Sequence, residues 1–180
     1  QQIEENKADI EFLPTGFQKL DDFLDGGFMR KELVVLGAAS GRGKSFCAGA
    51  MFYNIAKKGF KSAYFSLEIS SETIASRLIG SFANIKPTFV ATGIFMTEED
   101  LVAKERAKAE IGAYDELMYF YDEIYEYEKI EKEIRGNGYE FIVIDFIQNI
   151  IAKETEEYAR LSRVALELQK LAKETNSCIL

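Results

Sequence analysis

A glycine-rich segment at residues 38–45, AASGRGKS, contains the residue types that bind phosphate. It matches the pattern GxxxxGK[ST] except that Ala38 replaces the first glycine. In such a loop the backbone N–H groups converge on phosphate oxygens, and glycines allow the torsions and close approach that a side chain would block. We therefore predict that the loop binds a nucleoside triphosphate through Ala39, Ser40, Gly41, Arg42, Gly43, Lys44, Ser45 and Phe46.

The last residues of this segment predict specific roles in phosphate chemistry. Lys44 can reach the β- and γ-phosphates, and the Ser45 hydroxyl can complete the ligand shell of Mg²⁺. The positive N-terminus of the helix that follows adds to the attraction. An alternative is a solvent-exposed turn, but an apolar run precedes the segment, and Cys47, Met51 and Ile55 recur behind it at helical spacing. This context favours phosphate binding with ATP and Mg²⁺ as cofactors.

Two carboxylates follow apolar runs elsewhere in the chain. Asp145 ends the run FIVI, where it can hold Mg²⁺ directly or through water, and Glu68 follows the run in YFSLEIS. Glu68 is therefore the candidate base that orients and deprotonates the attacking water, with Lys44 as the other catalytic candidate. Taken singly, Asp145 could merely start a loop, and Glu68 could be an exposed residue near a helix start.

Other polar residues near these positions are less informative. Gln148 lies shortly after Asp145 and is a possible γ-phosphate sensor, but an ordinary loop hydrogen-bonder fits equally well. Arg77 fits a surface ion-pair partner and Arg42 a solvated loop residue, rather than cations that stabilise a transition state. The chain has no histidine, which removes the commonest zinc ligand and general base. Acid–base chemistry must therefore fall to carboxylates.

Alternating apolar runs and helical periods must position these residues. The runs are nearly continuous, as in strands that are covered on both faces, and amphipathic stretches separate them. This order predicts an α/β fold with a mainly parallel sheet between two layers of helices. The expected strands are ELVVLGA (32–38), KSAYFSL (61–67), LMYFYD (117–122), FIVIDF (141–146) and SCIL (177–180), and the expected helices span 44–58, 71–83, 97–112, 125–135 and 156–175.

Length and composition limit the class of protein. A chain of 180 residues that is 47% hydrophobic suits one domain with a substantial core. Its apolar runs are shorter than the roughly 20 residues of a membrane span, and it starts without a secretory pattern, so we expect a cytoplasmic protein. Its two cysteines fit reduced core residues. A net charge of −8 argues against a surface that binds polyanions throughout, although a local basic loop fits.

The two ends of the chain differ from its middle. Residues 1–12 are polar and acidic, and we expect an N-terminal arm or linker remnant there, followed by an incomplete ATPase core over residues 13–180. The sequence stops at NSCIL, within an expected strand and before the loop that should follow it. Ligands of open parallel sheets bind at the carboxyl ends of strands, so we expect further functional residues after Leu180.

With these residues in place, the chain resembles the RecA-like ATPase domain of bacterial and phage replicative helicases, the DnaB family. LPTGFQKLDDFLDGG looks like the lead-in of that family, AASGRGKS is similar to its P-loop, and FSLEIS resembles its catalytic-glutamate motif. ATG at 91–93, VIDFIQ at 143–148 and LQKLAKETNSCIL continue in the family's order. The resemblance covers nearly the whole chain and implies a RecA-like P-loop NTPase fold.

The resemblance also implies an activity and partners. It implies an ATP-driven motor that forms a ring, a hexamer in the full-length protein, and translocates on single-stranded DNA, with primase or a helicase loader as possible partners. Lys44, Ser45, Glu68 and Asp145 would carry hydrolysis. The family's strand-end glutamine sensor and its arginine finger would follow Leu180, so we expect this chain alone to bind nucleotide better than it hydrolyses it. A DNA-facing loop would correspond to IIAKETEEYARLSR.

Two other functions share part of this pattern. A RecA-type or clock-type ATPase in recombination or regulation would have the same fold and chemistry, but the SLE and IDFIQ motifs argue against it. A nucleotide-dependent oligomerisation module without useful turnover would be expected to have a damaged catalytic carboxylate. Glu68 and Asp145 are both present, which favours the motor.

Overall fold

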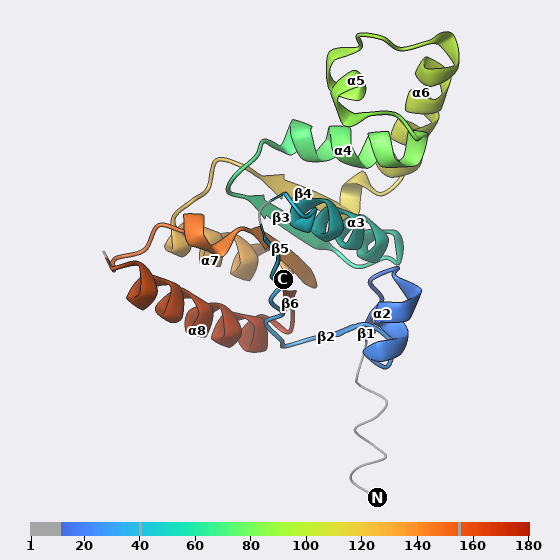
Figure 1. Ribbon diagram of the computed structural model, residues 1–180. Helices are drawn as coiled ribbons and strands as arrows, with labels where there is room; N and C mark the ends of the chain where they lie inside the picture. Colours follow the sequence, from blue (N-terminus) through green and yellow to red (C-terminus); the bar gives the residue numbers. More distant parts are fainter. Residues whose placement is uncertain (1–11, 40, 155) are drawn as a thin grey trace, which may run out of the picture.

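A parallel sheet forms the centre of the molecule in the computed structural model, which describes residues 12–39, 41–154 and 156–180 (Figure 1). Its strands lie in the order β4-β3-β5-β6, and every pair is parallel. The predicted α/β fold with a parallel sheet is therefore confirmed. The strands are β3 (Ser62–Ser66), β4 (Met118–Tyr121), β5 (Phe141–Asp145) and β6 (Cys178–Ile179).

The two central strands are buried along their whole length because both of their faces are covered. β3 reads SAYFS and β5 reads FIVID, and every residue of both strands is buried. Aromatic and β-branched side chains suit such strands because they pack well on a pleated surface. The register pairs Ser62 with Phe141 at one end and Ser66 with Asp145 at the other. The two strands therefore end side by side.

Helices cover the two faces of the sheet and divide the core into two parts. On one face α3 (Lys44–Lys57) packs with residues such as Met51 and Phe52 against Tyr64 and Val143. On the other face α7 (Tyr127–Asn137) and α8 (Glu157–Thr175) pack against alternate residues of the same strands (Figure 1). These helices confirm the expected ones to within two residues at most ends, and α4 (Ser71–Ala83) has the expected bounds.

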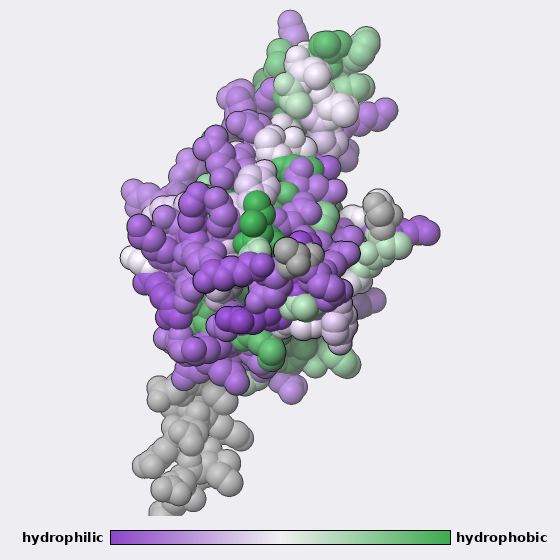
Figure 2. All heavy atoms as spheres, turned by 90° about the vertical axis from the view of Figure 1, so that its left-hand side faces the viewer, coloured by the Kyte–Doolittle hydropathy of each residue, from purple (hydrophilic) through white to green (hydrophobic). Residues whose placement is uncertain are grey.

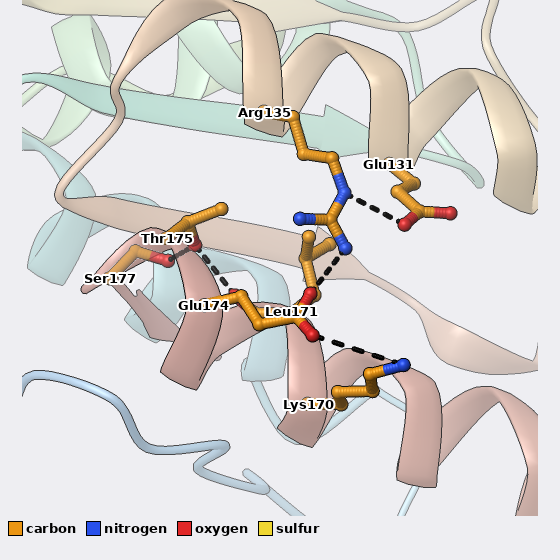
Figure 3. Close-up of polar contacts among 7 residues, drawn as sticks. All are labelled: Glu131, Arg135, Lys170, Leu171, Glu174, Thr175 and Ser177. Atoms are coloured by element: carbon orange, nitrogen blue, oxygen red, sulfur yellow. Dashed lines mark hydrogen bonds and ion pairs between the residues drawn. The ribbon is translucent and has the colours of Figure 1, made fainter.

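Polar contacts join α7 to the end of α8, just before β6 (Figure 3). Arg135 of α7 reaches Glu174 at 2.5 Å and Glu131 at 2.8 Å, and Thr175 donates to the Leu171 carbonyl at 2.8 Å. The charged side chains are partly exposed, so each pair contributes at most about 1 kcal/mol. The pair between Arg135 and Glu174 links α7 to the last turn of α8, and Asn176 ends that helix in the left-handed conformation.

A lobe of helices projects beyond the sheet at the top of Figure 1. It consists of α4, α5 (Pro87–Thr92) and α6 (Glu98–Gly112), and α6 begins with a capping box of Thr97 and Asp100. The short helix α5 was not expected, because six residues are too few to show a helical period. Green, apolar spheres are visible on this lobe at the top of Figure 2. The exposed large apolar side chains of the lobe are Phe82, Ile94, Phe95, Leu101 and Val102.

The expected strand at 32–38 is wrong in the described structure. Only Leu33 forms a bridge, with Ile179 of β6, and the backbone N–H of Val34 donates to the Ile179 carbonyl at 2.8 Å. Within the described residues, positions 35–38 pair with no strand, and Val35 is 82% exposed. The segment nevertheless leads from the edge of β6 directly to the glycine-rich loop.

The segment before this bridge forms a small unit of its own. β1 (Phe12–Leu13) and β2 (Phe28–Met29) pair antiparallel, and α2 (Gln18–Phe23) lies between them in the chain. Short 3₁₀ turns occur elsewhere, at Asp115–Leu117 (η2) and Ile147–Asn149 (η3). These elements are too short to be found by sequence periodicity. Residues 1–11 of the expected arm lie outside the described residues. Among the helices that the structure describes, none combines the length and apolar character needed to span a membrane.

The central position of β5 leads to a stability prediction. Ile142 is fully buried, so Ile142→Ala should lower the free energy of unfolding by about 2–5 kcal/mol through lost burial and a cavity. Leu166→Ala on the exposed face of α8 is the control and should change it by about 0.5 kcal/mol or less. Urea unfolding monitored by circular dichroism measures both, and equal effects would contradict the central position of β5.

Candidate nucleotide-binding site

The glycine-rich loop and the carboxyl ends of β3 and β5 enclose a cavity of about 650 Å³. This volume lies within the range of ligand sites, about 300–1,000 Å³. The cavity therefore brings together Lys44, Glu68 and Gln148, which lie far apart along the chain and were predicted to belong to one site. The cavity is lined by Gly41, Gly43, Lys44, Ser45, Phe46, Glu68, Ile69, Arg77, Pro87, Phe146 and Gln148.

A second cavity of about 260 Å³, the inner cavity, adjoins the first. It shares Lys44, Phe146 and Gln148 with the larger cavity and is also lined by Ala38 and Asp145. Asp145 therefore lines the inner cavity, Glu68 lines the larger one, and Lys44 lines both.

The loop has the backbone geometry that phosphate binding requires. Gly43 has φ = 87° as the residue before α3, Gly41 has φ = 73°, and a Cβ atom on either would meet nothing within 4 Å. No side chain of the described residues caps the start of α3, so its first N–H groups are open to an anion. The Lys44 ammonium group donates to the Ala38 carbonyl at 3.1 Å, within the loop. Ser40, also predicted to bind nucleotide, lies outside the described residues.

Asp145 is a buried carboxylate at the end of β5. It is 6% exposed, and the Tyr64 hydroxyl donates to its Oδ2 atom at 2.8 Å. Burial raises the pKa of the Tyr64 hydroxyl, and the negative charge of Asp145 raises it further. The hydroxyl therefore remains a hydrogen-bond donor at neutral pH. Sequence reasoning missed Tyr64. The spacing could have indicated it. Tyr64 lies two residues before Ser66, so both side chains are on the same face of β3, and Ser66 pairs with Asp145.

Glu68 lies on an anchored loop but has a free carboxylate. The Leu67 N–H donates to the Asp145 carbonyl at 2.8 Å, and the Asn149 side chain donates to the Leu67 carbonyl at 2.8 Å. The Ser66 hydroxyl also bonds the Ile69 carbonyl, which closes the turn. Within the described chain the Glu68 carboxylate is exposed and has no hydrogen-bond or ion-pair partner. A residue that accepts a proton in the cavity needs both a backbone held in place and a carboxylate free of other partners.

Two further polar residues face the same cavity. Gln148 lies on η3 and lines both cavities, and Arg160 of α8 donates to its backbone carbonyl at 3.4 Å. Arg77 of α4 lines the larger cavity and has no ion pair with any described residue, in contrast to the surface ion pair that we expected. Sequence spacing placed Arg77 on a helix but did not show that this side of α4 faces the loop.

The oxygen ligands near the loop fit Mg²⁺ rather than a metal held by protein alone. Ser45 and Asp145 offer a hydroxyl and a carboxylate, the hard ligands that Mg²⁺ prefers. The described residues contain no cluster of three or more His, Cys, Asp or Glu side chains that could hold a metal ion. Mg²⁺ usually keeps several waters and binds through one or two carboxylates plus substrate phosphates. A site with one carboxylate and one hydroxyl is consistent with this coordination.

The chain matches a known protein family over most of its length. The model of the DnaB-like helicase C terminal domain family matches residues 13–180. The chain is 31% identical over 183 residues to the replicative DNA helicase DnaC of Bacillus subtilis, covering 97% of this chain and 39% of that protein. It is 28% identical over 177 residues to the replicative DNA helicase DnaB of Treponema pallidum, covering 94% and 40%. The chain thus spans about two-fifths of these relatives' length.

Solved structures agree with the family match. One, described as an ATPase domain, superposes with a TM-score of 0.85 at 22% identity, over 99% of this chain and 65% of that one. A DnaB-like replicative helicase, described with its interactions with primase, superposes with a TM-score of 0.83 at 22% identity, over 99% and 44%. At this identity the likeness shows the fold, and it confirms the expected RecA-like architecture.

The anchored Glu68 loop leads to a kinetic prediction. Asn149→Ala removes the hydrogen bond to the Leu67 carbonyl and should lower kcat for ATP hydrolysis roughly tenfold, because a mobile base is misplaced. The dissociation constant for ATP should change less than about twofold, since Asn149 does not line the cavity. Steady-state turnover and fluorescent-nucleotide titration test this. A loss of binding with unchanged kcat would contradict the assigned anchor.

Proposed function

The chain belongs to the DnaB-like helicase C-terminal domain family, and from this premise we propose that it is the ATP-hydrolysing motor domain of a ring-forming replicative DNA helicase that translocates on single-stranded DNA. The observation that carries the proposal is that Lys44, Glu68 and Asp145 converge on adjoining cavities at one edge of the sheet. That edge is where open parallel sheets bind their ligands.

The loop residues bind the triphosphate in this proposal. Backbone N–H groups of residues 39–46, including those at the start of α3, surround the β-phosphate, and no side chain of the described residues caps that helix start. Lys44 exchanges its bond to the Ala38 carbonyl for the β- and γ-phosphate oxygens. Phe46 lines the same cavity with 44% of its surface exposed, so it can contact the bound nucleotide.

Ser45 and Asp145 would hold Mg²⁺, which neutralises the charge that develops on the phosphates when it is bound. Glu68 orients a water for attack on the γ-phosphorus and accepts its proton as the bond to the ADP oxygen breaks. Glu68 suits this role because it is exposed to the cavity and unpaired within the described chain. Gln148, which lines both cavities, is the candidate sensor of the γ-phosphate.

Arg77 is an additional residue in this proposal. It lines the same cavity as the loop and Glu68, and it is half-buried without an ion pair to the described residues. An unpaired guanidinium group in a phosphate-binding cavity attracts the most highly charged part of the nucleotide. We assign Arg77 to the γ-phosphate on this basis.

The segment after η3 is the candidate contact to single-stranded DNA. The segment after η3 carries exposed Lys153, while Arg163 pairs with Glu154 at 3.4 Å and Glu167 at 3.3 Å. Lys153 and backbone amides are therefore better candidates for phosphate contact than Arg163. We further propose a homo-hexameric ring in the cytoplasm that meets primase or a loader. One of the structural neighbours is described with its interactions with primase.

A regulatory or recombination ATPase and a non-hydrolysing oligomerisation module are less well supported. The family match over residues 13–180 favours the helicase lineage, and the site retains both a buried and a free carboxylate beside the loop. The proposal therefore includes turnover as well as binding.

ATP turnover by the full-length protein, with and without single-stranded DNA, tests the proposed function. We expect DNA to stimulate turnover, and Glu68→Gln to lower kcat at least about 100-fold because the base is removed. Glu72→Gln, on an exposed position of α4, is the control and should retain normal turnover. Turnover that is indifferent to DNA would contradict the motor. Tight ATP binding without turnover in either protein would support the oligomerisation module instead.

The assignment of Arg77 has its own test. Arg77→Gln should weaken ATP binding by about 10- to 100-fold, the worth of a hydrogen bond to a charged group, and weaken ADP binding much less. Arg106→Gln on an exposed position of α6 is the matched control, because Arg106 does not line the cavity. Titration of both nucleotides measures the ratio. Equal losses for ATP and ADP would place Arg77 elsewhere on the nucleotide.

A further inference from the structure

Tyr64 is the described side chain that holds the buried carboxylate of the site. Its hydroxyl donates to Oδ2 of Asp145 at 2.8 Å, and within the described residues no other side chain is bonded to this carboxylate. The Oδ1 atom is left for another ligand, and Asp145 lines the inner cavity together with Lys44. One oxygen is therefore engaged by the protein, and the other remains available beside the loop.

The register of the sheet makes this contact possible. Tyr64 pairs with Val143, and Ser66 pairs with Asp145, so Tyr64 and Asp145 are diagonal neighbours on adjacent parallel strands. Side chains two residues apart on a strand share a face, and the core places Tyr64 and Val143 on the face covered by α3. The tyrosine therefore reaches along the sheet to the carboxylate from the side of the loop helix.

The ring of Tyr64 is fixed by aromatic neighbours from two other elements. Phe52 of α3 meets it edge-on, with ring centroids 5.6 Å apart, and Phe120 of β4 stacks against it with centroids 6.1 Å apart. Phe52 and Phe120 also contact each other at 5.0 Å. Tyr64 is fully buried, so the hydroxyl has little freedom to leave the carboxylate. The helix that begins with Lys44 is thus packed on the ring that orients Asp145.

We infer that Tyr64 is a positioning residue for the metal-binding carboxylate: its hydroxyl holds Asp145 so that Oδ1 faces the Mg²⁺ of the bound nucleotide. Its packing on Phe52 keeps the carboxylate aligned with the loop that α3 carries. This inference rests on the proposed function, because it takes the ligand to be a magnesium nucleotide. Hydrogen-bond partners of metal ligands have this effect generally, and their loss typically costs about 10- to 100-fold in metal affinity.

Metal binding rather than turnover provides the test. In the full-length protein saturated with a non-hydrolysable ATP analogue, free Mn²⁺ is followed by electron paramagnetic resonance during a Mn²⁺ titration. Tyr64→Phe keeps the ring and removes the hydroxyl, and it should weaken Mn²⁺ binding roughly tenfold. Nucleotide binding in the presence of a chelator should stay within about twofold of the unaltered protein, because Tyr64 does not line the larger cavity.

Two further variants make the outcomes distinguishable. Tyr53→Phe is the matched control, because Tyr53 is also buried and donates to a carboxylate, Glu110, at 3.4 Å, and it should leave Mn²⁺ binding unchanged. Asp145→Asn should weaken Mn²⁺ binding more than Tyr64→Phe does. If Asp145→Asn is weakened and Tyr64→Phe is not, this inference is overturned and the proposed site stands. If neither variant changes Mn²⁺ binding, the assignment of Asp145 in the proposed function is itself wrong.

A spectroscopic measurement covers the case in which Tyr64→Phe does not fold. 3-Fluorotyrosine is incorporated site-specifically at position 64 and, in a separate sample, at position 53, so that each ¹⁹F resonance is assigned without the Tyr64→Phe variant. In the nucleotide-bound protein the resonance of position 64 should shift when Mg²⁺ is added, because the carboxylate it bonds becomes a metal ligand. The resonance of position 53 should not shift. An unmoved signal at position 64 would contradict the inference.

Discussion

The parallel pairing of β3 with β5 is the constraint on which the site depends. Ser66 lies opposite Asp145, so the two strands end side by side. Glu68 and Phe146, which follow the two strand ends, therefore lie at the same edge of the sheet. A slip of one residue would turn every side chain of one strand to the other face. Asp145 would then point toward α7 and α8, away from the loop and from Tyr64. Burial of both faces fixes the register, because either slip would place Asp145 or Ser66 in an apolar layer.

The same pairing gives two carboxylates different environments. Asp145 is buried, accepts a hydrogen bond from Tyr64 and lines a cavity together with Lys44, which suits a carboxylate that faces a metal cation. Glu68 lies beyond the strand end, exposed to the larger cavity, with its backbone held through Leu67. One group is suited to bind metal and the other to accept a proton. The separation of these roles follows from burial and not from residue type.

Much of the fold was predictable because its signals are local. The apolar runs of β3 and β5 and the bounds of α4 follow from composition and period, and the loop motif places Lys44 at a helix start. The failures involve partners distant in sequence. Residues 32–38 have the composition of a strand, yet a strand needs a neighbour along its length, and among the described residues only Leu33 forms a bridge, with Ile179. The roles of Tyr64 and Arg77 depend on register and on the orientation of α4, neither of which a residue pattern contains.

The central claim is that one magnesium nucleotide bridges the loop, β5 and the turn after β3. A crystal structure of the protein with Mg²⁺ and a non-hydrolysable ATP analogue tests it most directly. We expect the β- and γ-phosphates within the loop of residues 38–45, the metal between the Ser45 hydroxyl and the Asp145 carboxylate, and Glu68 facing the γ-phosphate. A nucleotide bound elsewhere, or a metal that contacts neither Ser45 nor Asp145, would contradict the account.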